Sequence, residues 1–443
     1  MDAELKPARE TPFYLRGNYA PVQDEVTLDA LEVEGAIPPE LDGLYLRNGP
    51  NPSEGSSQHW FFGDGMLHGL KLGGGKAHWY RNRFVQTRQL AGEKMMRDDF
   101  SLDYRVGAAN TSVIAHADRI FALVESSFPH EVRPDLSTVG PWDAGGALKA
   151  NVTAHPKICP VTGEMHAFGY GFMPPWLMYH RFAPDGSLIE SFGVDMGGPT
   201  MIHDFAITAG YVIFLDLPVV FDLERALKGK MPYVWSDDYP ARIGVMPRGG
   251  TAGQVRWASV NPCYVFHVAN AFEADGKIVI DVSRYPELWR AKAEAFDASA
   301  QLWRWELDLA SMTVAETLVD DRSMEFPTIN PACTGLKNRV IFAASDGRVG
   351  SMGTDFDRIM RYDTASGVTI EKAFGERALV SEFAYAAGGV GEDEGWVMGF
   401  VFDRDRAASD FVILDARTLG ETARIRLPRR VPQGFHGAWI AGV

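Results

Sequence analysis

Cysteine, long apolar runs, excess positive charge and helical periodicity are all scarce in this chain of 443 residues. Its three cysteines, Cys159, Cys263 and Cys333, lie far apart and form no CxxC pair. This spacing argues against a zinc knuckle or a disulfide framework, and it favours a reducing, cytoplasmic setting. The formal net charge of -15 argues against a general nucleic-acid binder, which needs a basic surface to displace counterions from phosphates.

No segment has the pattern expected of a membrane span or a signal peptide. The most apolar run, residues 211–220, is interrupted by Asp216 and Pro218, and residues 1–14 lack a basic stretch followed by an apolar core. Hydrophobic residues nevertheless make up 46% of the chain and aromatic residues 12%, which is enough for a large core or an apolar cavity. A disordered chain is therefore not expected.

Short apolar segments separated by Gly, Asp-Gly or Pro turns follow one another along nearly the whole chain, as in residues 176–192 and 263–282. They predict an all-β array, and strands repeated around an axis allow a chain of this length to form one unit. We expect the polar, proline-containing residues 1–40 to form an extended arm around the body. Residues 222–230 and 283–300 are interpreted as short helices or loop insertions.

Four histidines share one setting, with strand-forming or turn residues around them, few adjacent charges, and a Gly or Pro nearby. They are His155, His203, His267 and His436. A single histidine of this kind is more typical of a packed core, but its recurrence favours a shared metal. A ring of blades, each with one strand near a common axis, would bring these distant positions together. His59 and His68 flank a turn, and we interpret them as packing or hydrogen-bonding residues.

Imidazole nitrogens suit iron, copper, nickel or zinc and disfavour calcium and magnesium. Four such ligands would close a tetrahedral zinc site, whereas octahedral Fe(II) would keep two positions open for chemistry with dioxygen. A ligating histidine also needs a partner for its second ring nitrogen, usually a carboxylate. Glu125, Glu325 and Glu382 stand in apolar, strand-like segments and are candidates, with solvated strand-edge positions as the alternative.

Seven segments spread over nearly the whole chain resemble the carotenoid cleavage oxygenase family, which includes retinal-forming, apocarotenoid-cleaving and lignostilbene-cleaving enzymes. They are LYLRNGPNP, HWFFGDGMLHG, NTSVIAH, TAHPKICPVTGE, MIHDFAIT, EFPTIN and GFHGAWI. The resemblance implies a single domain over residues 1–443, a seven-bladed β-propeller with a dome of loops and short helices over its metal-bearing face.

The same resemblance assigns roles to the candidate residues. It implies an Fe(II) ion on the propeller axis, held by the four histidines, with each of the three glutamates orienting one iron-bound histidine. Thr111 matches a threonine whose methyl group crowds an open iron position and limits access by water. The implied reaction is dioxygen-dependent scission of a carbon-carbon double bond, which gives two carbonyl products without an external reductant. The alkene would lie beside the iron in an apolar tunnel. Candidates for the tunnel wall are Phe128, Phe172, Trp176 and Phe205, although each suits an ordinary core equally well.

One departure from the family pattern bears on the substrate. Stilbene-cleaving members carry a lysine before the first glutamate, where it contacts the substrate's phenol oxygen, whereas this chain has Val124. We therefore expect an extended apolar alkene, a carotenoid or apocarotenoid. A lignostilbene or phenylpropanoid cleaver is the alternative, and a non-catalytic ligand-binding propeller is a third hypothesis. Because carotenoids dissolve in membranes, we also expect transient contact with a membrane surface through an exposed apolar patch. No oligomeric state is predicted.

Overall fold

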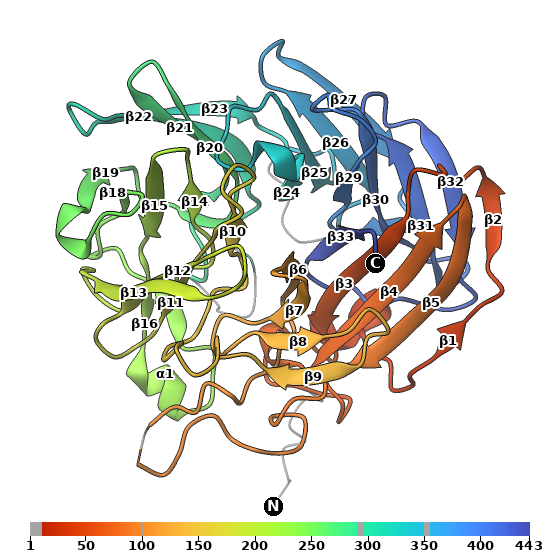
Figure 1. Ribbon diagram of the computed structural model, residues 1–443, viewed down its shortest axis with the longest axis horizontal. Helices are drawn as coiled ribbons and strands as arrows, with labels where there is room; N and C mark the ends of the chain where they lie inside the picture. Colours follow the sequence, from red (N-terminus) through yellow and green to blue (C-terminus); the bar gives the residue numbers. More distant parts are fainter. Residues whose placement is uncertain (1–10, 100, 291–295, 297, 350–354) are drawn as a thin grey trace, which may run out of the picture.

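A computed structural model describes residues 11–99, 101–290, 296, 298–349 and 355–443. In this part of the chain, seven antiparallel sheets of four to six strands stand as blades around a common axis (Figure 1). The predicted seven-bladed propeller is therefore confirmed. A small sheet outside the blades pairs β16 (Val219–Phe221) with β17 (Tyr233–Trp235).

Five of the blades are four-stranded and follow the chain in order, with each strand bonded to its neighbour in the blade. Two of them contain β6 (Ser112–His116), β7 (Arg119–Leu123), β8 (His130–Val132) and β9 (Thr138–Pro141), then β10 (Lys157–Ile158), β11 (Met165–Tyr170), β12 (Leu177–Phe182) and β13 (Leu188–Val194). The next two contain β14 (Ala206–Ile207), β15 (Tyr211–Asp216), β18 (Arg242–Pro247) and β19 (Arg256–Ser259), then β20 (Tyr264–Ala274), β21 (Lys277–Tyr285), β22 (Gln301–Asp308) and β23 (Val314–Asp320). The last contains β24 (Glu325–Thr328), β25 (Val340–Ser345), β26 (Arg358–Asp363) and β27 (Val368–Ala373).

The two remaining blades combine strands from both ends of the chain and so close the ring. One has the order β1-β5-β4-β3-β33, with β1 (Thr27–Leu28), β3 (Gly43–Pro50), β4 (Gly65–Gly73), β5 (Lys76–Phe84) and β33 (Gly437–Ala441). The other has the order β2-β32-β31-β30-β28, with β29 also on β30. Its strands are β2 (Glu32–Gly35), β28 (Ala378–Val380), β29 (Ala384–Ala387), β30 (Gly395–Asp403), β31 (Ala408–Asp415) and β32 (Glu421–Arg426).

The predicted N-terminal arm contributes the outer strands of these two blades. Residues 1–10 lie outside the described residues, and residues 11–40 contain the short 3-10 helices η1 (Phe13–Leu15) and η2 (Gly17–Tyr19) followed by β1 and β2. Strand β1 pairs with β5, and β2 pairs with β32. The described part of the arm therefore joins the first and last segments of the propeller.

Burial is greatest in the strands next to the innermost one of each blade and lowest in the outer strands. All residues of β3 and of β25 are buried, whereas β13 and β27 alternate between exposed and partly covered side chains. The innermost strands β10 and β33 are largely half-buried. Blades pack face to face, so their middle strands are covered on both sides, and the pleat of an outer strand leaves every second side chain to solvent. Buried strands thus support the innermost strands from behind.

One of the two predicted helical segments forms a helix. Helix α1 (Leu223–Leu227) is capped by the Asp222 carboxylate, which accepts a hydrogen bond from the Arg225 N–H at 3.0 Å. Residues 283–285 instead end β21, and the described residues of 286–300 form a connection without a helix; residues 291–295 and 297 lie outside the described residues. Trp289 adopts a left-handed φ of 57° and is buried, which fits the insertion alternative.

The other helices are short. They are η3 (Trp60–Phe62), η4 (Ala252–Gln254) and η5 (Pro331–Cys333). Among the described residues, no helix combines the length and the apolar character that a bilayer crossing requires.

The closing contact between β3 and β33 gives a stability prediction. A Cβ at Gly43 would lie 2.3 Å from the Ile440 carbonyl oxygen, so Gly43→Ala must push β33 away from β3. We expect this variant to lose about 1–3 kcal/mol of stability, as in overpacked cores. Gly253→Ala is the control, because a Cβ there meets no atom within 4 Å. Equal denaturant midpoints for the two variants would contradict the packing of β33 described above.

Candidate metal centre and adjoining cavity

The four predicted ligand histidines lie on or just before the strand of their blade that is nearest the axis. His155 precedes β10, His203 precedes β14, His436 directly precedes β33, and His267 lies within β20. Figure 1 shows these strands around the centre of the ring. The propeller therefore brings together residues that are far apart in the sequence.

The imidazole rings converge on one point. His155 Nε2 lies 3.0 Å from His203 Nε2, and His267 Nε2 lies 3.1 Å from His436 Nε2. One nitrogen from each of the four rings lies within 4.8 Å of all the others. The lone pairs of four nitrogens placed this close together repel one another. A bound cation would remove this repulsion and stabilise the arrangement.

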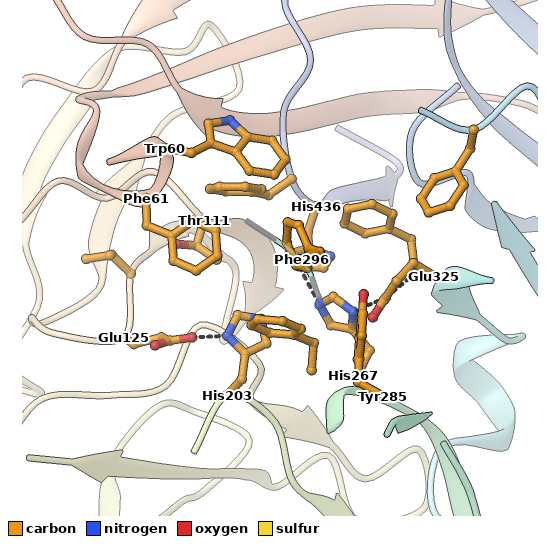
Figure 2. Close-up of a pocket in the computed structure, with 15 residues that line it drawn as sticks. Trp60, Phe61, Thr111, Glu125, His203, His267, Tyr285, Phe296, Glu325 and His436 are labelled. Carbon is orange, nitrogen blue, oxygen red and sulfur yellow. Dashed lines mark hydrogen bonds and ion pairs between the residues drawn. The ribbon is translucent and has the colours of Figure 1, made fainter. Parts of the chain in front are cut away.

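Three of the histidines pair with the three predicted glutamates through the opposite ring nitrogen. Figure 2 shows Glu125 directed at His203 and Glu325 directed at His267, and in each pair a carboxylate oxygen contacts Nδ1. Glu382 accepts from His436 Nδ1 at 3.1 Å. These carboxylates fix the ring orientation and leave Nε2 as the free donor, which is typical of histidine ligands. In the described part of the chain, no carboxylate pairs with the ring of His155.

Each glutamate is itself held by a further donor. The Tyr170 hydroxyl donates to Glu125, and the Gly437 N–H donates to Glu382 at 2.6 Å. The Phe326 N–H donates to Glu325 at 2.6 Å, and Phe326 has a left-handed φ of 55° that is rare for a bulky residue. Strain of this kind is typical of functional sites, where the surrounding structure enforces it.

Burial and charge set the protonation of the site. Burial, together with the neighbouring histidines, holds the pKa of His155 and of His267 well below the usual range, so both rings are neutral. Burial also lowers the pKa of His203, but the Glu125 carboxylate outweighs it and the net shift is upward. Burial raises the pKa of Glu325 to about 7. Neutral imidazoles are the form that binds a metal, and the carboxylates partly balance its charge.

The donor set therefore fits a transition-metal ion. It offers four nitrogens and no oxygen or sulfur atom, and a hard cation such as calcium or magnesium would disfavour it. The cluster and its orienting glutamates are buried or nearly so, which excludes most competing water. The four-histidine cluster is therefore a candidate metal centre.

An apolar cavity of about 640 Å³ opens beside the metal centre. Its wall is mostly aromatic (Figure 2). The lining residues are Trp60, Phe61, Thr111, Val124, Glu125, His203, Phe266, His267, Tyr285, Phe296, Glu325, Phe326, Phe356, Phe435 and His436. Its surface suits an apolar ligand.

Thr111 lies in the wall of this cavity with its hydroxyl already engaged. The hydroxyl donates to the Asn110 side-chain oxygen at 3.0 Å, and the Asn110 amide donates to the carbonyls of Phe61 and Gly63. The Thr111 carbonyl accepts from the His436 N–H at 3.1 Å. Thr111 is thus tied to a metal-site histidine through its backbone.

Of the five predicted substrate-binding residues, one lines the cavity and four do not. Val124 lines the cavity. Phe128 and Phe205 are fully packed in core clusters and do not line it, and Phe172 stacks on Phe221 with ring centroids 5.0 Å apart. Trp176 is half-buried between β11 and β12 and does not line it either.

Several cavity residues escaped the sequence analysis although a signal was present. Phe266, Phe326 and Phe435 are chain neighbours of His267, Glu325 and His436, just as Val124 is the neighbour of Glu125. Adjacency to a ligand or to its glutamate was therefore a usable signal. Trp60, Phe61 and Phe296 come from connections between strands and carried no such signal.

A second cavity of about 780 Å³ reaches the metal centre along more polar walls. It shares His267 and His436 with the apolar cavity, and it is also lined by His155, Lys157 and Asp204. The histidine cluster consequently lies between an apolar cavity and a more polar one.

Comparison with known proteins places this arrangement in a family. The family model described as retinal pigment epithelial membrane protein matches residues 19–441. A carotenoid cleavage oxygenase of Mycobacterium tuberculosis is 36% identical over 96% of this chain and 97% of its own length. A carotenoid 9,10(9',10')-cleavage dioxygenase 1 of Arabidopsis thaliana is 32% identical over 96% of this chain and 89% of its own.

Two solved structures are similar to this chain over nearly its whole length. The lignostilbene dioxygenase of Pseudomonas brassicacearum has a TM-score of 0.88 at 29% identity, covering 99% of this chain and 100% of that one. The cobalt-substituted apocarotenoid oxygenase of Synechocystis has a TM-score of 0.86 at 29% identity, covering 97% and 98%. With the family model and these relatives matched over nearly their whole length, the chain belongs to the carotenoid cleavage oxygenase family.

Proposed function

We propose that this protein is an iron(II)-dependent dioxygenase that cleaves a carbon-carbon double bond of a carotenoid or apocarotenoid to give two carbonyl products. The observation that carries the proposal is the convergence of four imidazoles beside an aromatic cavity. A purely structural zinc site would need no cavity, and a binding module would need no metal centre. A family of alkene-cleaving oxygenases supports the same reaction class.

Iron(II) would be held by His155, His203, His267 and His436, and when bound it would supply the activation of dioxygen that no side chain provides. The glutamates keep the three rings they contact in one tautomer. The aromatic wall holds the alkene by burial of apolar surface and excludes water from the site. The engaged hydroxyl of Thr111 leaves its methyl group as the part able to crowd the site, which supports a steric role for this residue. No general acid or base is required by this reaction.

The cavity wall supports an apolar substrate over a phenolic one. Among the described residues that line it, none is Lys or Arg, and Val124 replaces the lysine expected of a stilbene cleaver. The alternative is a lignostilbene or phenylpropanoid dioxygenase, and Tyr285 is the observation that favours it. This residue lines the cavity, and its hydroxyl, which is hydrogen-bonded to Glu325, could also accept a hydrogen bond from a polar substrate end. The structural similarity to a lignostilbene dioxygenase also supports this alternative.

The proposed substrate also suggests a membrane-facing surface. Phe62 belongs to the same short helix as two cavity residues and is 43% exposed, and Leu223 and Leu227 of α1 are 61% and 75% exposed. Gly229, which follows α1, lies against Gln58, so the two segments are neighbours. We propose that these side chains make transient contact with a bilayer. The double variant Leu223→Ser/Leu227→Ser should then sediment less with phosphatidylcholine vesicles, and unchanged sedimentation would contradict the contact.

The proposed cellular setting is the cytoplasm. All three cysteines are free, and two of them are buried, which fits a reducing compartment.

Metal content and activity should respond differently to loss of a ligand and to loss of a supporting charge. After anaerobic purification we expect about one iron per chain, and we expect His203→Ala to lose both the iron and the activity. Glu325→Gln keeps an oxygen that accepts from His267 but removes the charge, so activity should fall about 10- to 100-fold.

Glu306→Gln is the matched control, because Glu306 forms an exposed pair with Lys277 far from the metal centre. It should behave as the wild type. Absence of stoichiometric iron in the wild type, or full activity of His203→Ala, would contradict the proposed function; an unchanged Glu325→Gln would contradict the role of that glutamate.

Substrate preference should follow the apolar wall. We expect the iron-loaded protein to have a higher kcat/KM for an apocarotenal than for a hydroxystilbene, with product masses showing cleavage at one double bond. Val124→Lys should shift this ratio toward the hydroxystilbene by placing a cation where the phenol would lie, whereas Val124→Leu should not. A wild-type preference for the stilbene would establish the alternative instead.

A further inference from the structure

A fourth buried carboxylate stands at the metal centre in addition to the three glutamates. Asp204 follows His203 directly and is 2% exposed. It accepts hydrogen bonds from the Phe205 and Val268 N–H groups, each at 2.8 Å, and pairs with the Lys157 ammonium at 2.7 Å. One cation and two backbone donors thus offset the desolvation of this buried charge.

The partners of Asp204 belong to three different blades. Lys157 opens β10 just after His155, Asp204 itself precedes β14 beside His203, and Val268 follows His267 in β20. Figure 1 shows β10, β14 and β20 next to one another around the centre. A single carboxylate therefore ties together the three segments that carry these three histidines.

The backbone of β20 is adapted to this contact. The pairing register between β20 and β21 shifts on both sides of Val268, so the strand is irregular at the residue that donates to Asp204. Irregularities of this kind re-aim side chains next to active sites. The same register shift includes His267. It therefore affects both the contact of Val268 with Asp204 and the direction of the His267 imidazole.

His155 is the histidine with the most to gain from this arrangement. Its ring has no carboxylate partner in the described part of the chain, unlike the rings of His203, His267 and His436. Its segment is instead anchored through Lys157 to Asp204. Metal ligands must be held within about 0.5 Å of their working positions, so anchoring of the backbone can replace anchoring of the ring.

We propose that Asp204 is a positioning residue that sets the spacing of the imidazoles of His155, His203 and His267 by linking their three blades. It acts through the histidines and touches neither the metal nor the substrate. This inference rests on the metal centre of the proposed function, and it adds a residue and a mechanism that the three glutamates do not cover.

The test uses Co²⁺ as the probe, because it reports both affinity, by competition with a chelator, and ligand geometry, by its visible absorption. Asp204→Asn keeps one acceptor oxygen but loses the charge that binds Lys157. We expect it to bind Co²⁺ about 10- to 100-fold more weakly than the wild type and to change the absorption spectrum. Lys157→Met should shift affinity in the same direction by a smaller factor.

Asp281→Asn is the matched control. Asp281 is equally buried and pairs with Arg304 at 2.8 Å, but both residues belong to one blade and neither adjoins a histidine of the cluster. It should lower the unfolding temperature without changing the affinity or the spectrum of Co²⁺.

Wild-type affinity and spectrum in folded Asp204→Asn would overturn the proposal. If that variant does not fold, Lys157→Met decides, and unchanged Co²⁺ binding in it would overturn the proposal as well. Absence of Co²⁺ binding by the wild type would instead contradict the proposed metal centre, so the two failures are distinguishable.

Discussion

Four imidazoles can share one buried point only if each ring is oriented and the backbone beneath it is rigid. The propeller meets this condition because its innermost strands approach a common axis and are backed by strands such as β3 and β25 that are fully buried. Glutamates contact the second nitrogen of three rings, and the fourth histidine is held through its own segment. The ring-closing contact of β33 with β3 is part of the same construction, because His436 directly precedes β33.

The two cavities beside the histidines give the site two chemically different sides. The apolar side has room for an alkene and keeps water out, whereas the polar side contains Lys157 and Asp204. The carboxylates that support the histidines are divided between the two cavities, because Glu125 and Glu325 line the apolar one and Asp204 and Glu382 line the more polar one. The aromatic residues of the apolar wall can still vary between relatives without replacing the histidines, which is how one fold supports different substrates.

The sequence predicted the architecture and the histidine set well, and the cavity wall poorly. Strand alternation and the motifs around His203 and His436 carry their information locally, so they could be recognised without coordinates. Side-chain direction is different: Phe205 is close to His203 in the chain but packs against Phe168, with ring centroids 5.1 Å apart. Trp60 and Phe61 reach the cavity from a connection whose path no periodicity encodes. The role of Asp204 depends on contacts between blades, which only the folded structure displays.

The most direct measurement of the central claim is X-ray absorption at the iron edge of the anaerobically loaded protein. Imidazole rings give a characteristic multiple-scattering pattern, so the spectrum counts the histidines bound to the metal. The account predicts that all four imidazoles are coordinated. A first shell containing a carboxylate or sulfur ligand from the protein, or fewer than four imidazoles, would contradict it.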